Sequence, residues 1–151
     1  MKLTLKDGSV LDIAEKKITG ADAAKKISEG LARNAVCVKL DGRLADLSEV
    51  IDADCAFEVV TLKDPEGLEV YRHTASHVLA QAVKSIYPTC KLAIGPTIEN
   101  GFYYDFDFKT PITKEDFGKI EAEMEKIIKA DFPIERFTLS RRKALEPPRM
   151  D

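Results

Sequence analysis

The chain has 151 residues, of which 44% are hydrophobic and 32% charged, and its formal net charge at pH 7 is −3. This composition allows a packed core for one ordinary domain or two small ones. No apolar run approaches the roughly 20 residues that a membrane-spanning helix needs. The acidic balance argues against a protein that coats nucleic acid, so any RNA contact must use a local patch such as Arg141, Arg142 and Lys143.

Cysteine usage and the N-terminus both indicate a protein of the reducing cytoplasm. Cys37, Cys55 and Cys90 are far apart in the sequence and odd in number, which argues against a disulfide framework. They form no CxxC pair, so a zinc site of four cysteines is excluded. The N-terminus has no apolar stretch of the kind that a secretory signal needs.

Residues 1–62 are expected to form a small α+β unit. Period-two alternation between turn residues predicts strands over residues 1–5, 10–13, 35–40 and 56–60. Thr19, followed three residues later by Asp22, predicts the capping box of a helix over residues 21–29, which Gly30 should end in a left-handed conformation. A hairpin, a helix and further strands in this order are typical of a β-grasp fold, which usually serves as a binding module.

A domain boundary is expected at residues 61–68, where Pro65 and Gly67 stand among polar side chains. Apolar residues then recur at spacings of three and four, which predicts a helix over residues 69–87. Pro88 should end this helix.

The remaining residues predict a second α+β unit with two helices that cover one face of a sheet. Strands are expected at residues 91–94, 102–108 and 134–139, the second with a regular alternation of aromatic and polar residues. Thr113, with Asp116 as its partner, should cap a helix whose apolar stripe is Phe117, Ile120, Met124, Ile127 and Ile128. Pro133 should end this helix. A short helix is expected over residues 141–146, and the prolines at 147 and 148 should end it.

The chain has two histidines, His73 and His77, and both lie on the helix predicted over residues 69–87. Four residues apart, they share one face of that helix, and this face points away from the apolar stripe, with Ala80 and Lys84 on the same side. Most such pairs are solvated surface residues. Two imidazoles one turn apart can also converge on one zinc ion or one water molecule. A zinc protease is improbable, because the HExxH motif needs Glu where this chain has Thr74.

Few other residues suggest chemistry. The aromatic segment 102–106 is more typical of a core than of a binding surface, although the Tyr104 ring can pack while its hydroxyl reaches a polar pocket. Asp105 and Asp107 are more typical of a solvated strand face than of a metal site. The sequence contains no Gly-rich phosphate loop, no Ser/His/Asp arrangement and no cysteine nucleophile.

Two stretches together carry a specific resemblance. HTASHVLAQAVK over residues 73–84 and LAIGPTIENGFYYDF over residues 92–106 resemble the editing domain of threonyl-tRNA synthetases, to which a domain of alanyl-tRNA synthetases is related. The first part of the chain, with turns at residues 7–9 and 41–43, resembles the TGS domain that precedes editing in the threonine enzymes. The resemblance therefore implies an α+β chain with a TGS domain of β-grasp fold over residues 1–62. Residues 63–151 would form the N-terminal part of the editing domain.

The resemblance implies that the chain is a fragment of a cytoplasmic threonine–tRNA ligase that hydrolyses mischarged seryl-tRNA(Thr). His73 and His77 would orient or deprotonate the attacking water, and Gly95, Asn100 and Tyr104 would hold the amino acid or the terminal adenosine. The fragment itself would require no cofactor, although the histidine pair could bind Zn²⁺, as the alanine-specific relatives suggest. The whole enzyme would bind tRNA(Thr), use Zn²⁺ and ATP with Mg²⁺, and form a homodimer through parts that are not in this chain.

The sequence departs from that family in two respects, one of which is that the aminoacylation and anticodon-binding domains are absent. The family completes its editing site with a later Cys-x-x-x-His element, but no histidine follows His77, and Ile94 stands four residues after Cys90. Little or no hydrolysis is therefore expected from the chain alone. Two alternatives stay open, namely a stand-alone TGS-type module that binds RNA or protein, with a structural histidine helix, and a free-standing trans-editing protein.

Overall fold

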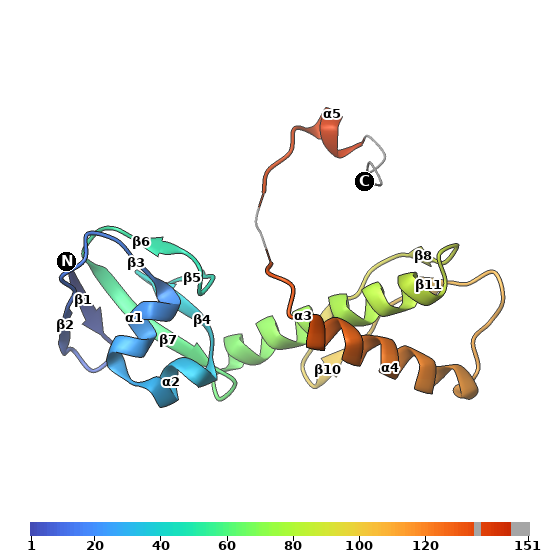
Figure 1. Cartoon of the computed structure of the whole chain (residues 1–151), viewed down its shortest axis with the longest axis horizontal. Coiled ribbons are helices and arrows are strands. Elements are labelled where there is room, and N and C mark those ends of the chain that lie inside the picture. The colour runs from blue at the N-terminus through green and yellow to red at the C-terminus, as the bar shows by residue number, and fades with distance from the viewer. Residues whose placement is uncertain (135–136, 146–151) are drawn as a thin grey trace.

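The computed structural model describes residues 1–134 and 137–145. Two bodies lie at opposite ends of the long axis of the molecule, and helix α3 (Pro65–Ile86) runs from the first into the second (Figure 1). The fold class is α+β, as the sequence predicts. None of the helices in the described ranges is long and apolar enough to cross a membrane.

The first body has the β-grasp arrangement predicted for it. Its mixed sheet has the order β2-β1-β7-β4-β5, with β1 parallel to β7 and the other neighbours antiparallel. The strands are β1 (Lys2–Leu5), β2 (Val10–Asp12), β4 (Ala35–Leu40), β5 (Arg43–Ala45) and β7 (Cys55–Thr61). A separate two-stranded ladder joins β3 (Ile18–Thr19) to β6 (Val50–Ile51). The buried core is formed around Leu3, Val38 and Phe57.

The helix predicted over residues 21–29 is observed, but its predicted end at Gly30 is wrong. Helix α1 (Gly20–Ile27) ends at Ser28, and α2 (Glu29–Asn34) begins directly after it. The Ser28 hydroxyl accepts a hydrogen bond from the Leu31 backbone N–H at 3.1 Å, so this serine caps the second helix, and Gly30 lies inside it. The predicted cap at Thr19 is confirmed, because its hydroxyl oxygen accepts the Asp22 backbone N–H.

Residues 61–68 contain the junction between β7 and α3, and α3 begins four residues earlier than predicted. Asp64 precedes the helix, and its carboxylate accepts hydrogen bonds from the backbone N–H and the hydroxyl of Thr61, at 2.8 and 3.0 Å. Pro65 takes the first helical position, where its missing N–H costs nothing. The first turn of α3 then packs against β4 and β7.

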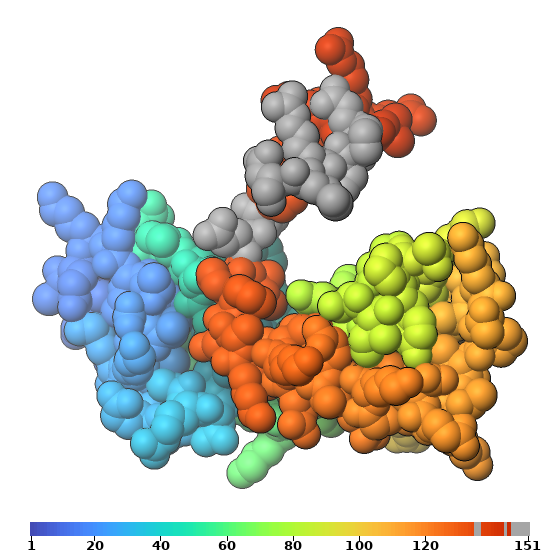
Figure 2. Space-filling view, turned by 45° about the vertical axis from the view of Figure 1, so that its right-hand side comes forward, coloured from blue at the N-terminus to red at the C-terminus, as the bar shows by residue number. Residues whose placement is uncertain are grey.

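The second body consists of two helices and two short strand pairs. Strand β8 (Lys91–Leu92) pairs with β11 (Phe106–Asp107), and β9 (Thr97–Ile98) pairs with β10 (Gly101–Phe102). Helix α4 (Lys114–Ala130) packs alongside α3 and lies on the surface shown in orange in Figure 2. Their shared core contains Ala82, Val83, Cys90 and Ile120.

The prediction of one continuous strand over residues 102–108 is wrong, although the alternation of burial along it is confirmed. Hydrogen bonds between Ala93 and Asp105 and between Asp105 and Ile94 extend the β8–β11 ladder. At Pro96 only one hydrogen bond forms, because its carbonyl accepts the Tyr103 N–H at 3.4 Å but the proline has no N–H to donate in return. The short strands β10 and β11 therefore stand in place of the one long strand that was predicted.

The apolar stripe predicted on α4 is only partly covered. The capping box is confirmed, since the Asp116 carboxylate accepts the Thr113 backbone N–H at 3.0 Å. Ile120 is buried, whereas 51% of Phe117 and 62% of Ile128 is exposed. Among the described residues, α3 is the main element packed against this helix.

The C-terminal predictions fall partly outside the described ranges. Residues 135–136 of the strand predicted over 134–139 lie outside them, and the described residues of that segment belong to no strand. Within the described part of the chain this segment has no strand to pair with, and an unpaired strand is not stable. The predicted helix at 141–146 is observed as α5 (Arg141–Ala144), and residues 146–151 lie outside the description.

Candidate functional site

The two histidines meet on the exposed face of α3. Their Nε2 atoms are 3.1 Å apart, and their rings meet edge to face with centroids 4.6 Å apart. Only one hydrogen can lie between the two nitrogens, so one imidazole donates and the other accepts. The accepting Nε2 is therefore unprotonated, and its single lone pair is engaged by the N–H of the other imidazole.

The orientation predicted for the pair is confirmed. Both imidazoles are exposed, whereas Ala82 and Val83 on the opposite side of the helix are buried in the core. Ser76, which stands between the histidines in sequence, is fully buried, and its hydroxyl donates to the His73 carbonyl at 2.7 Å. The helix thus presents both imidazoles on one exposed face.

Two hollows flank the pair. We call the first the apolar hollow; it has a volume of about 790 Å³, and both histidines lie on its wall together with Val78, Gln81, Ile127, Ile128, Phe132 and other residues. We call the second the tyrosine hollow; it has a volume of about 520 Å³ and is lined by His77, Ala80, Gln81, Lys84, Ser85, Leu92 and Tyr104. His77 and Gln81 are the two described residues that line both hollows.

Gly95 and Tyr104, two of the three predicted substrate-binding residues, are in contact. A Cβ atom built on Gly95 would lie 2.1 Å from Cδ2 of the Tyr104 ring, so this ring rests directly on the glycine backbone. The Tyr104 ring also stacks on the ring of Phe106, and the two centroids are 4.8 Å apart. This packing fixes Tyr104 in the wall of the tyrosine hollow.

Replacing Gly95 with alanine is expected to displace the Tyr104 ring and to lower the free energy of unfolding by about 1–2 kcal/mol, because the added methyl group overlaps the ring. Urea unfolding measures the stability, and the NMR signals of the ring report the displacement. Gly118→Ala is the matched control, since Gly118 lies in α4 with no atom within 4 Å of its built Cβ and should gain helix propensity. Unchanged ring signals in Gly95→Ala would contradict the contact.

Asn100, the third predicted substrate-binding residue, lies elsewhere. It lines a separate hollow of about 540 Å³ that lies beside the first half of α3. Arg72 holds the neighbouring turn, because its Nη1 donates to the Glu99 carbonyl at 2.6 Å. The structure therefore brings Tyr104 to the histidine pair but does not bring Asn100 there.

The histidine pair supplies two of the ligands that a zinc ion would need. Two Nε2 atoms 3.1 Å apart could bind one metal ion together, but zinc sites in proteins use at least three protein ligands. Within residues 1–134 and 137–145, no group of three histidine, cysteine or acidic side chains is placed to hold a metal. No chemical step is therefore assigned to zinc here.

Lys84 shares the face of the histidines, as predicted, but its ammonium has a structural task. Its Nζ donates to the backbone carbonyls of Pro88 and Cys90, each at 2.8 Å, and so ties down the chain beyond the end of α3. Gln81 had no role in the sequence interpretation. The signal that could have found it is its spacing, since it continues the series of His73 and His77 by another four residues.

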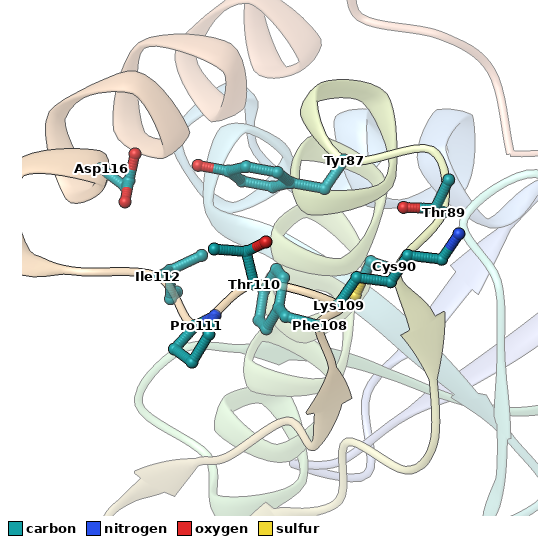
Figure 3. Close-up of a pocket in the computed structure, with 9 residues that line it drawn as sticks. All are labelled: Tyr87, Thr89, Cys90, Phe108, Lys109, Thr110, Pro111, Ile112 and Asp116. Carbon is teal, nitrogen blue, oxygen red and sulfur yellow. The ribbon is translucent and has the colours of Figure 1, made fainter.

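A further cavity of about 350 Å³ lies between the C-terminal end of α3 and the start of α4 (Figure 3). The hydroxyl of Tyr87 points toward Asp116 across it, and Cys90 lies at its side (Figure 3). Burial raises the pKa of the Cys90 thiol, which disfavours the nucleophilic thiolate. None of the residues predicted for a site lines this cavity.

Known proteins match both parts of the chain in sequence. Residues 1–61 match the TGS domain family. The threonine–tRNA ligases of Clostridioides difficile and Acetivibrio thermocellus are each 53% identical to the chain over 146 residues, which is 97% of this chain and 23% of the relative. The enzyme of Symbiobacterium thermophilum is 51% identical over 142 residues, covering 94% of this chain and 22% of the relative. The chain thus spans less than a quarter of the length of these relatives. It contains a TGS domain and is homologous to the N-terminal region of threonine–tRNA ligases.

Proposed function

We propose that the chain supplies the TGS domain and the first part of the editing domain of a threonine–tRNA ligase, and that it contributes to hydrolysis of mischarged seryl-tRNA(Thr). The observation that carries this proposal is the exposed His73–His77 pair, with its Nε2 atoms 3.1 Å apart, beside Tyr104. Homology that extends through 97% of the chain favours this function over a stand-alone module sharing only the TGS domain. The leading TGS domain also argues against a free-standing trans-editing protein.

The need for hydrolysis has a physical origin. Serine differs from threonine by one methyl group, and a pocket discriminates against such a loss by only about 1–3 kcal/mol. A second site that cleaves the wrong ester can remove what the synthetic site accepts. The ester between amino acid and ribose is already reactive, so a positioned water and a base suffice.

In the proposed step, an imidazole of the pair with a free nitrogen lone pair takes a proton from water as the water oxygen attacks the ester carbonyl carbon. The tetrahedral intermediate then collapses, the bond between the carbonyl carbon and the ribose oxygen breaks, and the ribose oxygen takes the proton from the imidazolium. Serine and tRNA with a free terminal ribose are the products. Tyr104, in the wall of the tyrosine hollow, is proposed to hold the amino acid or the terminal adenosine.

The remaining activities belong to the whole enzyme in this proposal. Aminoacylation of tRNA(Thr) with ATP and Mg²⁺, the zinc expected of the whole enzyme and dimerisation would all use parts outside these 151 residues. The whole ligase would act in the cytoplasm.

The test compares the whole ligase with the 151-residue chain in the hydrolysis of seryl-tRNA(Thr), with threonyl-tRNA(Thr) as the control substrate. The ligase should hydrolyse the seryl ester and spare the threonyl ester. The isolated chain should show little hydrolysis, because no histidine follows His77 in its sequence to complete the Cys-x-x-x-His element expected of the editing site. A ligase that cleaves neither ester would refute the proposed function, and rapid cleavage by the isolated chain would show that the site is already complete.

A further inference from the structure

Most polar side chains around the histidine pair already have hydrogen-bond partners. The Thr74 hydroxyl donates to the Val70 carbonyl at 3.1 Å, and the Ser85 hydroxyl donates to the Glu123 carboxylate at 3.2 Å. The Lys84 ammonium is held at the end of α3 by two carbonyls. These three groups are therefore engaged within the protein.

Apart from the histidines themselves, two side chains with donors remain. Of the other polar side chains that line the two hollows, Gln81 and Tyr104 carry N–H or O–H groups without a protein partner in the described part of the chain. Gln81 is exposed and follows His77 by one helical turn, so their Cβ atoms are about 5–6 Å apart. Its side-chain amide has two N–H donors and one acceptor oxygen.

The position of Gln81 separates it from Tyr104. Tyr104 lines only the tyrosine hollow, whereas Gln81 and His77 line both hollows. An aminoacylated adenosine has two unlike parts, and the ester lies where they join. A substrate with one part in each hollow would place its ester over His77 and Gln81.

We propose that Gln81 is a substrate-binding residue whose side-chain N–H donates a hydrogen bond to the carbonyl oxygen of the aminoacyl ester; this inference rests on the proposed hydrolysis. As water attacks, the π electrons of the carbonyl move to its oxygen, and the Gln81 N–H stabilises the negative charge that develops there. Collapse of the intermediate returns this electron pair as the ribose oxygen leaves. Donors aimed at such an oxygen act mainly on the transition state.

The test uses single-turnover hydrolysis of seryl-tRNA(Thr) by the whole ligase over a range of enzyme concentrations. Gln81→Met keeps the length of the side chain but removes its donor. The variant should have a maximal rate about 10- to 100-fold lower than wild type, which is a smaller loss than removal of a fully buried oxyanion donor causes. Its half-saturating concentration should change less than about twofold. Glu121→Met is the matched control, because Glu121 is exposed on α4 and lines neither hollow, and its maximal rate should stay within about twofold.

The outcomes separate this inference from the function on which it rests. A Gln81→Met enzyme with an unchanged maximal rate, in a ligase whose hydrolysis still depends on His77, would refute the role of Gln81 alone. A variant that changes only the half-saturating concentration would show that the amide holds another part of the substrate, which also overturns the inference. A wild-type ligase without hydrolysis would refute both. Circular dichroism confirms that the variant is folded.

Discussion

Replacing His77 with alanine is expected to slow hydrolysis of seryl-tRNA(Thr) by the whole ligase about 100- to 10,000-fold, and His73→Ala should have an effect of similar size. The reason is the 3.1 Å contact between the two Nε2 atoms, which makes each imidazole the hydrogen-bond partner of the other. Because they act as one unit, the double variant should be little slower than either single variant. Single-turnover hydrolysis measures all three rates.

The internal control for the histidine variants is aminoacylation. Charging of tRNA(Thr) with threonine should continue at its normal rate in the same preparations, which shows that the protein is folded and binds tRNA. Hydrolysis that stays within threefold of wild type in both single variants would mean that the pair is a solvated surface feature. Multiplicative losses in the double variant would mean that the imidazoles act separately.

Gly67→Ala is expected to reduce the free energy of unfolding by about 3 kcal/mol, the largest change in stability that we predict. A Cβ atom built on Gly67 would lie 2.0 Å from the Thr61 carbonyl oxygen and 2.8 Å from its carbonyl carbon. Both atoms belong to the backbone, so no side chain can rotate away. The first turn of α3 would have to separate from the end of β7, with loss of the packing around Val60.

Urea unfolding followed by circular dichroism measures this loss. Gly30→Ala provides the comparison, because Gly30 is also helical, but the nearest atom to its built Cβ is the Ser28 hydroxyl at an ordinary 3.6 Å. That variant should be as stable as wild type or slightly more so. Equal midpoints for Gly67→Ala and Gly30→Ala would show that α3 does not approach β7 as closely as the structure indicates.

Features set by neighbouring residues were predictable from sequence. The caps at Thr19 and Thr113 depend on a hydroxyl and on a residue three positions later, and both helices begin where these residues indicate. The meeting of His73 and His77 follows from helical spacing alone, and so does their exposure opposite the apolar stripe. Each of these predictions depends on the geometry of a single helix.

Features set by contacts between elements were not predictable. The sequence at Pro65 and Gly67 is typical of a loop, but Pro65 can also begin a helix, and Gly67 is needed because α3 passes close to Thr61. Gly30 has the residue type of a helix end, yet the chain turns two residues earlier at Ser28. In both places tertiary packing decides between two local structures that the residues allow.

The same distinction applies to the candidate site. The contact between the Tyr104 ring and Gly95 depends on how the backbone pairs around Pro96. This pairing register cannot be predicted from either segment alone. Asn100 belongs to the same sequence motif, but it lies beyond that break and lines another hollow. Residues of one sequence motif therefore need not meet in the site, whereas residues one turn apart on a helix do lie side by side.

Helix α3 fixes both the distance between the two bodies and the angle about the helix axis at which the histidines point. It is continuous from Pro65 past His77, and its 22 residues correspond to a length of about 33 Å. Each residue inserted between Pro65 and His73 would turn the imidazoles by about 100° around the helix axis while moving them only about 1.5 Å. A single insertion would thus leave the β-grasp body folded and the histidines paired, yet aim them in another direction. An insertion of seven residues would nearly restore the original azimuth, so the segment tolerates changes in length only in steps that preserve its helical phase.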